Sequence, residues 1–145
     1  MKIISDAEAE IRALVEARVE AIRREDLEGL VGPNWVDVVT FDVLPPLRNF
    51  GADGIRERSQ KWLDSYADGP HYEIRDLEVV AGDDVAFAWY LYQVSGTLKD
   101  GGEVKMWVRC TLGLRHDSGK WEIVHEHDSV PFDAETGKAS LGLKP

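Results

Sequence analysis

Apolar and polar residues near the start of the chain repeat with the period of a helix. Apolar side chains recur there at steps of three and four residues, at Ile11, Leu14, Val15 and Ile22. This spacing places them on one helical face, and Ser5 and Glu8 stand at capping-box spacing ahead of them. We therefore predict an amphipathic helix over residues 5–24, followed by a short helix that Asp26 caps and that ends near Gly32.

The hydrophobic period then changes from that of helices to that of strands. Residues 35–43 are rich in β-branched and aromatic side chains, which favours a strand, and a helical face returns over residues 53–66. Four alternating stretches separated by glycine-bearing turns follow, at residues 71–81, 84–96, 103–116 and 120–131. This order predicts an α+β fold in which three helices pack on a curved, mixed or antiparallel sheet and enclose a pocket.

Composition narrows the class of protein and its partners. A chain of 145 residues with 43% hydrophobic residues suits a single domain, residues 1–145. No run approaches the ~18 apolar residues of a membrane helix, and the first residues lack the pattern of a signal peptide, so we expect a cytoplasmic protein. Cys110 is the only cysteine, which excludes an internal disulfide. The net charge of −10 disfavours nucleic acids and anionic membranes as partners.

Two runs in the last third of the chain resemble a known family. Residues 107–115 are followed, after a turn, by a strand that begins at Trp121 and contains His125-Glu126-His127-x-Ser129-x-Pro131. This hairpin is similar to the last hairpin of SnoaL-like, ketosteroid-isomerase-like proteins of the nuclear-transport-factor-2-like (NTF2-like) superfamily, and to the association domain of calmodulin-dependent kinase. The resemblance implies a cone-shaped domain around one small-molecule pocket. Because that superfamily includes isomerases, cyclases, dehydratases, epoxide hydrolases and non-catalytic binders, the function has to be argued from the site.

The resemblance also implies where an isomerase site would lie. In the isomerase, an Asp moves a proton while a Tyr and a protonated Asp hold the developing oxyanion. Matched to that template, the base falls on Asp42, whereas Arg18 takes the place of the Tyr and Thr111 that of the protonated Asp. The matched oxyanion donors are absent, and no replacement pair of Tyr and Asp is evident nearby. Steroid isomerisation by that mechanism is therefore not expected.

Arg18 lies within the apolar stripe of the first helix, so its cation is aimed at the core. Its head either pairs with an internal carboxylate, such as Asp42 or Asp128, or meets a ligand carboxylate, enolate or carbonyl inside the cavity. Both interpretations stay open. Both also place Arg18 and Asp42 at one common cavity.

Alternation on the residue 103–116 strand places Trp107, Arg109 and Thr111 on one face. This face lines either the pocket or a surface between two sheets in a dimer. Continuous pairing through the short turn would bring it near Glu126 and Asp128, and a bulge would reverse the choice.

The last strand offers carboxylates on one face and imidazoles on the other. The isomerase register implies that Glu126 and Asp128 face the pocket, and that His125 and His127 face the opposite side. The two histidines could chelate a metal, but Ser129 is a poor third ligand on their face. With no phosphate-binding glycine loop either, we expect no metal and no organic cofactor.

Other side chains complete the expected pocket. Its predicted lining comprises Trp35, Trp62, Tyr66, Tyr90, Trp107, Arg109, Thr111 and Glu126. Phe87 and Trp89 belong either to this lining or to the core and dimer face.

The hypothesis that follows is a small-molecule enzyme without a cofactor. It is an isomerase, lyase or hydratase that acts by proton transfer on a small apolar carbonyl compound, through Asp42, Arg18 and Asp128. The alternatives are a ligand-binding or accessory domain without catalysis, and an oligomerising association module. A homodimer is expected through the sheet face that carries Trp107 and the two histidines.

Overall fold

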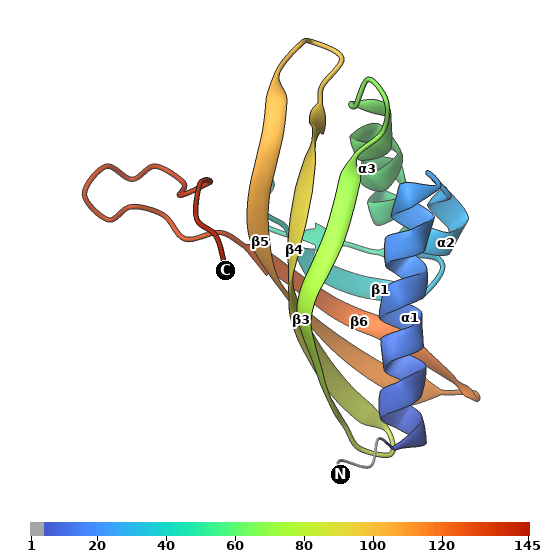
Figure 1. The fold of residues 1–145 in the computed structure, drawn as a ribbon. Helices are drawn as coiled ribbons and strands as arrows, with labels where there is room; N and C mark the ends of the chain where they lie inside the picture. Colours follow the sequence, from blue (N-terminus) through green and yellow to red (C-terminus); the bar gives the residue numbers. More distant parts are fainter. Residues whose placement is uncertain (1–4) are drawn as a thin grey trace.

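Helices and strands follow one another in the predicted order. The computed structural model describes residues 5–145 (Figure 1). Its elements are α1 (Asp6–Arg23), α2 (Leu27–Val31), β1 (Asn34–Phe41), β2 (Asn49–Phe50), α3 (Ala52–Asp64), β3 (His71–Ala81), β4 (Val85–Thr97), β5 (Glu103–Asp117) and β6 (Lys120–Ser129). Among these elements, the two-residue strand β2 is the one that the hydrophobic pattern does not predict.

The strands form a mixed sheet in the order β2-β1-β6-β5-β4-β3. Strands β3 to β6 make the antiparallel meander that their turns predict, and β1 runs parallel to β6. The three helices of the described chain lie on one face of this sheet (Figure 1). We call the face toward the helices the inner face and the other the outer face. The predicted α+β fold, with helices packed on a curved sheet, is confirmed.

Side-chain caps fix the starts of the first two helices. The Ser5 hydroxyl accepts a hydrogen bond from the Glu8 backbone N–H at 3.1 Å, and the Asp26 carboxylate accepts one from the Gly29 N–H at 3.1 Å. Each cap satisfies a backbone donor that has no partner inside its own helix. With its start fixed in this way, α1 packs its apolar stripe over the sheet, where Ile11 is fully buried.

A bulge in the β5–β6 hairpin decides which residues of β6 face inward. Near the turn Leu114 pairs with Ile123, but the next pair along is Gly113 with His125, so Val124 is an extra residue on β6. Because strand side chains alternate between faces, one extra residue exchanges the faces of all that follow.

Beyond the bulge, the inner face carries the two carboxylates of β6. Leu112 pairs with Glu126 and Cys110 pairs with Asp128, and paired residues of neighbouring strands share a face. Thr111 pairs with His127, so the imidazole lies on the outer face.

Inner and outer faces differ in how well they are covered. Fully buried side chains gather between the inner face and α1: Ile11, Val15, Val38, Val108, Cys110, Leu112, Leu114 and Ile123. On the outer face, Phe87 and Trp89 stack with ring centroids 5.6 Å apart and both remain exposed. None of the helices formed by residues 5–145 is long and apolar enough to cross a membrane.

The chain ends in a segment that leaves the sheet. Residues 130–145, which we call the C-terminal arm, extend from the end of β6 away from the helices (Figure 1). Apart from the partly buried residues 130, 131 and 140, the arm is exposed along its whole length.

Candidate functional site

A cavity of about 460 Å³ lies between the helices and the inner face of the sheet. We call it the inner cavity. Its walls are mostly apolar and come from every helix of the described chain as well as from the sheet: Ile22, Leu30, Ile55, Trp62, Val94 and Met106 are among them. Its polar groups include Arg18, Glu126 and Asp128. An apolar cavity with a few convergent polar groups is typical of a small-molecule site.

Arg18 and Glu126 form a buried ion pair. The Arg18 Nη2 lies 2.7 Å from the Glu126 Oε1, and both side chains are largely shielded from solvent. Burial alone would raise the pKa of Glu126, but the charge of Arg18 and the hydrogen bonds from Arg18 and Asp128 together outweigh it, and the net pKa is lowered. Burial alone would likewise lower the pKa of Arg18, but the charge of Glu126, together with its hydrogen bond and smaller contributions from neighbouring groups, turns this into a rise. Each partner therefore keeps the other charged.

Asp128 has the opposite environment, although it lies two positions along the same face. Burial, and then the neighbouring Glu126 carboxylate, raise the pKa of Asp128 well above its ordinary value. The Tyr92 hydroxyl donates to its Oδ2 at 2.9 Å, and a hydrogen bond shared with Glu126 raises the pKa of Asp128 further. Asp128 is therefore favoured as a neutral acid that shares its proton with Glu126.

The hydrogen bond from Tyr92 corrects a sequence-based expectation. A replacement pair of Tyr and Asp was not evident from the sequence, yet Tyr92 and Asp128 form one. Burial is the main reason that the pKa of Tyr92 is raised well above its usual value, so its phenol stays protonated as a donor. The alternation along β4 indicates that Tyr92 faces inward. Only the register of β4 on β5 and of β5 on β6, however, places Tyr92 beside Asp128.

A trio of neighbouring side chains on the inner face has the donor types of a metal site. One ligand atom from each of Cys110, Glu126 and Asp128 lies within 4.8 Å of the others. The chemistry of the trio opposes a cation, because Glu126 already holds the positive charge of Arg18. Burial also raises the pKa of the Cys110 thiol, which favours its neutral form. The donor set does not fit a metal.

Asp42 lies at the rim of the inner cavity, just after β1. Its Oδ1 accepts from the Val43 backbone N–H at 2.7 Å, and its Oδ2 lies 3.0 Å from the Arg58 Nη2 of α3. The Asp42 side chain is 38% exposed. Asp42 and Arg18 both line the inner cavity, one at its rim and one in its buried part.

Three of the predicted lining residues lie on the wrong face. Trp107, Arg109 and Thr111 belong to the outer face, because the bulge at Val124 places Cys110 rather than Arg109 opposite Asp128. The expectation that they line the pocket is wrong. Arg109 instead donates from its Nε to the Ser129 hydroxyl at 3.1 Å.

The remaining predicted lining residues divide between cavity and core. Trp62 lines the inner cavity, as does Glu126. Tyr66 and Tyr90 are buried in the core, where Tyr66 meets the edge of Trp62 with ring centroids 5.9 Å apart. The Arg115 guanidinium lies over the ring of Trp35, 4.6 Å from the ring centroid. The expectation that Tyr66, Tyr90 and Trp35 line the pocket does not hold, because aromatic character does not distinguish a core position from a cavity wall.

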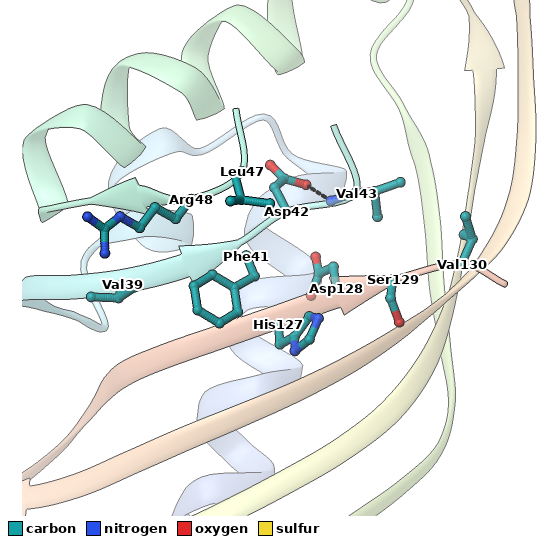
Figure 2. A pocket seen from close by; sticks show the side chains of 10 residues that line it. All are labelled: Val39, Phe41, Asp42, Val43, Leu47, Arg48, His127, Asp128, Ser129 and Val130. Carbon is teal, nitrogen blue, oxygen red and sulfur yellow. Dashed lines mark hydrogen bonds between the residues drawn. The ribbon is translucent and has the colours of Figure 1, made fainter. Parts of the chain in front are cut away.

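A second cavity of about 620 Å³ opens at the outer face, where β1 and β6 end. We call it the outer cavity. Phe41 and His127 lie beside each other at its floor, with ring centroids 5.4 Å apart, and Leu47 and Arg48 come from the loop after β1 (Figure 2). Four residues line both cavities: Phe41, Asp42, Val43 and Asp128. The buried acid Asp128 is thus bordered by open space on both sides of the sheet.

Comparisons with known proteins agree with this architecture. A family model described as a SnoaL-like domain matches residues 11–133. An NTF2-like protein of unknown function from Pseudomonas putida KT2440 shares 34% identity over 96% of each chain, with a TM-score of 0.88.

Two more distant solved structures share the fold. One is a protein with a cystatin-like fold from Caulobacter vibrioides, at 19% identity over 90% of this chain and 93% of its own, with a TM-score of 0.76. The other is a ketosteroid isomerase-like protein from Erwinia carotovora atroseptica SCRI1043, at 22% identity over 86% of this chain and 96% of its own, with a TM-score of 0.73. A search among curated proteins gives no match.

Proposed function

The chain belongs to the SnoaL-like domain family, and from this we propose that its inner cavity is the site of a cofactor-independent isomerase or lyase. The substrate would be a small, largely apolar carbonyl compound. One observation carries the proposal: an ionised Glu126 and a neutral Asp128 lie side by side in a desolvated cavity, with their pKa values moved in opposite directions. Titratable neighbours whose environments separate their pKa values in this way are typical of acid–base catalysis.

In this proposal Asp128 is the acid that faces the substrate oxygen. Tyr92 occupies its Oδ2 and Glu126 shares its proton, and the carbonyl oxygen of a bound substrate would take the place of Glu126 as the acceptor of that proton. As a proton leaves the carbon next to the carbonyl, negative charge develops on that oxygen, and the hydrogen bond from Asp128 strengthens. Arg18 remains a cation beside the same space and adds to this stabilisation.

Asp42 is the base of the proposed reaction. It would take the proton from the carbon next to the carbonyl and form an enolate or dienolate. Return of the proton to another carbon completes an isomerisation, whereas loss of a leaving group from the next carbon completes an elimination. Arg58 orients the Asp42 carboxylate at the rim, where a substrate held by the apolar walls would present its edge.

The test is proton exchange, which does not require the natural substrate. A panel of cyclic enones and β-hydroxyketones is incubated in D₂O, and deuterium incorporation and product formation are followed by NMR. We expect exchange with the unmodified protein, and losses of about 10²-fold or more in Asp42→Asn and Asp128→Asn. Asp83→Asn, an exposed turn residue, is the matched control and should retain full exchange. Equal exchange in all four proteins would contradict the proposal.

One observation favours a second candidate function, a ligand-binding domain without turnover. Both oxygens of Asp42 are already engaged, one by the Val43 backbone N–H and the other by Arg58, so a substrate would have to displace one of these contacts to reach it. In that case the same compounds would raise the melting temperature of the protein without deuterium exchange. Asp42→Asn would then leave ligand stabilisation unchanged, whereas Asp128→Asn would reduce it.

A further inference from the structure

The proposed reaction leaves the outer cavity without a role. At about 620 Å³, this cavity lies within the ~300–1,000 Å³ range of small-molecule sites. Val39 and Leu47 give it apolar walls, and the Phe41 ring lies at its floor (Figure 2). Arg48 and His127 line the outer cavity and not the inner one. The outer cavity is therefore a second candidate ligand site with polar groups of its own.

Arg48 brings to this cavity a cation that no carboxylate of residues 5–145 neutralises. The chain has 27 acidic and 17 basic side chains, and most of its described arginines form ion pairs: Arg12, Arg18, Arg23, Arg24, Arg56, Arg58 and Arg75. Arg48 lines the cavity without such a partner, and Figure 2 shows its side chain directed away from Asp42. Its guanidinium is available to an external anion, and the planar fork of donors matches a carboxylate.

The two aspartates of the outer cavity do not offset this cation. Asp42 accepts from the Val43 backbone N–H at its Oδ1 and pairs with Arg58 of α3 at its Oδ2. Asp128 belongs to the inner face, where burial and the Glu126 carboxylate favour its neutral form. The outer cavity is thus locally cationic on a chain whose net charge is −10. This charge favours a small anion as the ligand and disfavours a cation.

Hydrogen-bond donors at the end of β6 complete the outer cavity. The Ser129 hydroxyl accepts from the Arg109 Nε at 3.1 Å, so its own proton is left for another acceptor. The His127 ring nitrogens have no hydrogen-bond partner among residues 5–145, and the ring meets Phe41 edge-on at an interplanar angle of 84°. A flat ligand packed on Phe41 would therefore find polar partners on β6 as well as the cation Arg48.

We propose that the outer cavity binds a small aromatic carboxylate, with the carboxylate on Arg48 and the ring against Phe41 and Leu47. A second polar group on the ring would be recognised by the donors of Ser129 and His127. One guanidinium matches one negative charge, so a monocarboxylate suits the site better than a phosphate group, which carries about two. The proposal stands whether or not the inner cavity is catalytic.

The first experiment measures affinity by calorimetry with para-hydroxybenzoate as the probe. Saturable binding is expected, with para-hydroxybenzyl alcohol, which lacks the charge, binding about 10-fold more weakly or less. Arg48→Gln should lose about 10-fold in affinity for the acid, and so should Leu47→Asp, which places an anion at a side chain that is 95% exposed. Circular dichroism checks that each variant is folded.

The matched control is Arg75→Gln, which removes the same charge from the opposite edge of the sheet. Arg75 lies on β3 and its side chain is 57% exposed, so this variant should bind the acid as the unmodified protein does. No saturable binding of the acid, or equal losses in Arg48→Gln and Arg75→Gln, would overturn the proposal.

The second experiment locates the probe by NMR of the ¹⁵N-labelled protein. On addition of para-hydroxybenzoate, the largest amide shifts are expected at Leu47, Arg48 and His127, which line the outer cavity only. Leu30 and Trp62, which line the inner cavity only, should shift little. Shifts concentrated at Leu30 and Trp62 would place the acid in the inner cavity and contradict a separate outer site.

Discussion

The two faces of β6 differ more in their environment than in their sequence. Glu126 and Asp128 point to the inner face, where helices exclude water and the pKa values of the two carboxyls move apart. His125 and His127 alternate with them and point to the outer face, against the edge of Phe41. The His125 Nδ1 lies 2.7 Å from the Val39 carbonyl. Four consecutive residues thus place two shielded carboxyl groups on one side and two imidazoles beside Phe41 on the other.

The comparison teaches that burial under the helices, and not residue type, decides which carboxyl groups have shifted pKa values. Asp42 and Asp128 are the same amino acid and line the same cavity. Asp128 is buried beside the Glu126 carboxylate, so its neutral form is favoured even though the hydrogen bond from Tyr92 works against it. Asp42 remains partly solvated at the rim, beside the cation Arg58. Burial and the sign of the nearest charge thus give two identical side chains different surroundings.

The largest expected effect comes from removing the cation of the inner face. Arg18→Met leaves Glu126 as an uncompensated buried carboxylate, and we expect a loss of ~3–5 kcal/mol in the free energy of unfolding at neutral pH. Urea titration followed by circular dichroism measures it. Arg24→Met, whose side chain is 64% exposed, is the matched control and should cost less than ~1 kcal/mol. Equal losses in the free energy of unfolding for Arg18→Met and Arg24→Met would contradict the claim that the buried ion pair matters more than a surface one.

A second prediction compares neighbours on the two faces of β5. Leu112 is fully buried on the inner face, whereas Thr111 is exposed on the outer face. Leu112→Ala should cost ~2–5 kcal/mol, because it removes apolar contacts and leaves a cavity. Thr111→Ala should change the free energy of unfolding by no more than ~0.5 kcal/mol. A large loss in Thr111→Ala would contradict the exposed position of Thr111 on the outer face.

The smallest effect is the pH dependence that Asp128 introduces. Because the pKa of Asp128 is raised in the folded state, the stability it contributes is present below the ordinary Asp pKa of ~3.9 and is lost as pH rises through the raised value. The free energy of unfolding should therefore fall with rising pH by up to ~1.4 kcal/mol per pH unit in that window. Asp128→Asn should remove this slope.

Measuring the pH slope of the free energy of unfolding above the ordinary Glu pKa of ~4.3 separates Asp128 from Glu126. The pKa of Glu126 is lowered, so its stabilisation is present above the ordinary Glu pKa of ~4.3 and is lost as pH falls. The exposed Asp83→Asn variant should keep the slope of the unmodified protein. A slope that persists in Asp128→Asn would assign it to another group.

Much of the fold follows from local pattern, but pairing between distant strands does not. The stripe of α1, its Ser5 cap and the glycine-bearing turns are all signalled within a few residues. The parallel pairing of β1 with β6 joins residues such as Val39 and His125, which no short-range period connects. The two-residue β2 is too short to show any period.

The dependence on pairing between distant strands also explains why some site residues were predicted correctly and others were not. Arg18 shows its inward direction by lying in an apolar helical stripe. Thr111 and Arg109 were misplaced because their face depends on the register of β5 against β6, and that register contains a shift that composition does not reveal. The pairing of Tyr92 with Asp128 cannot be seen in the sequence, because the two residues lie two strands apart in the sheet.

The bulge at Val124 has a consequence comparable to a frameshift. If Val124 were paired in the ladder, its partner would be Gly113, and His125 and His127 would take the inward positions opposite Leu112 and Cys110. The cavity would then be floored by two imidazoles, and the carboxylates would face the outer surface. The register of this hairpin therefore decides whether the scaffold presents acids or nitrogen ligands to its interior. A related chain that closed the bulge and kept its length would change its chemistry without changing a single side chain of the strand.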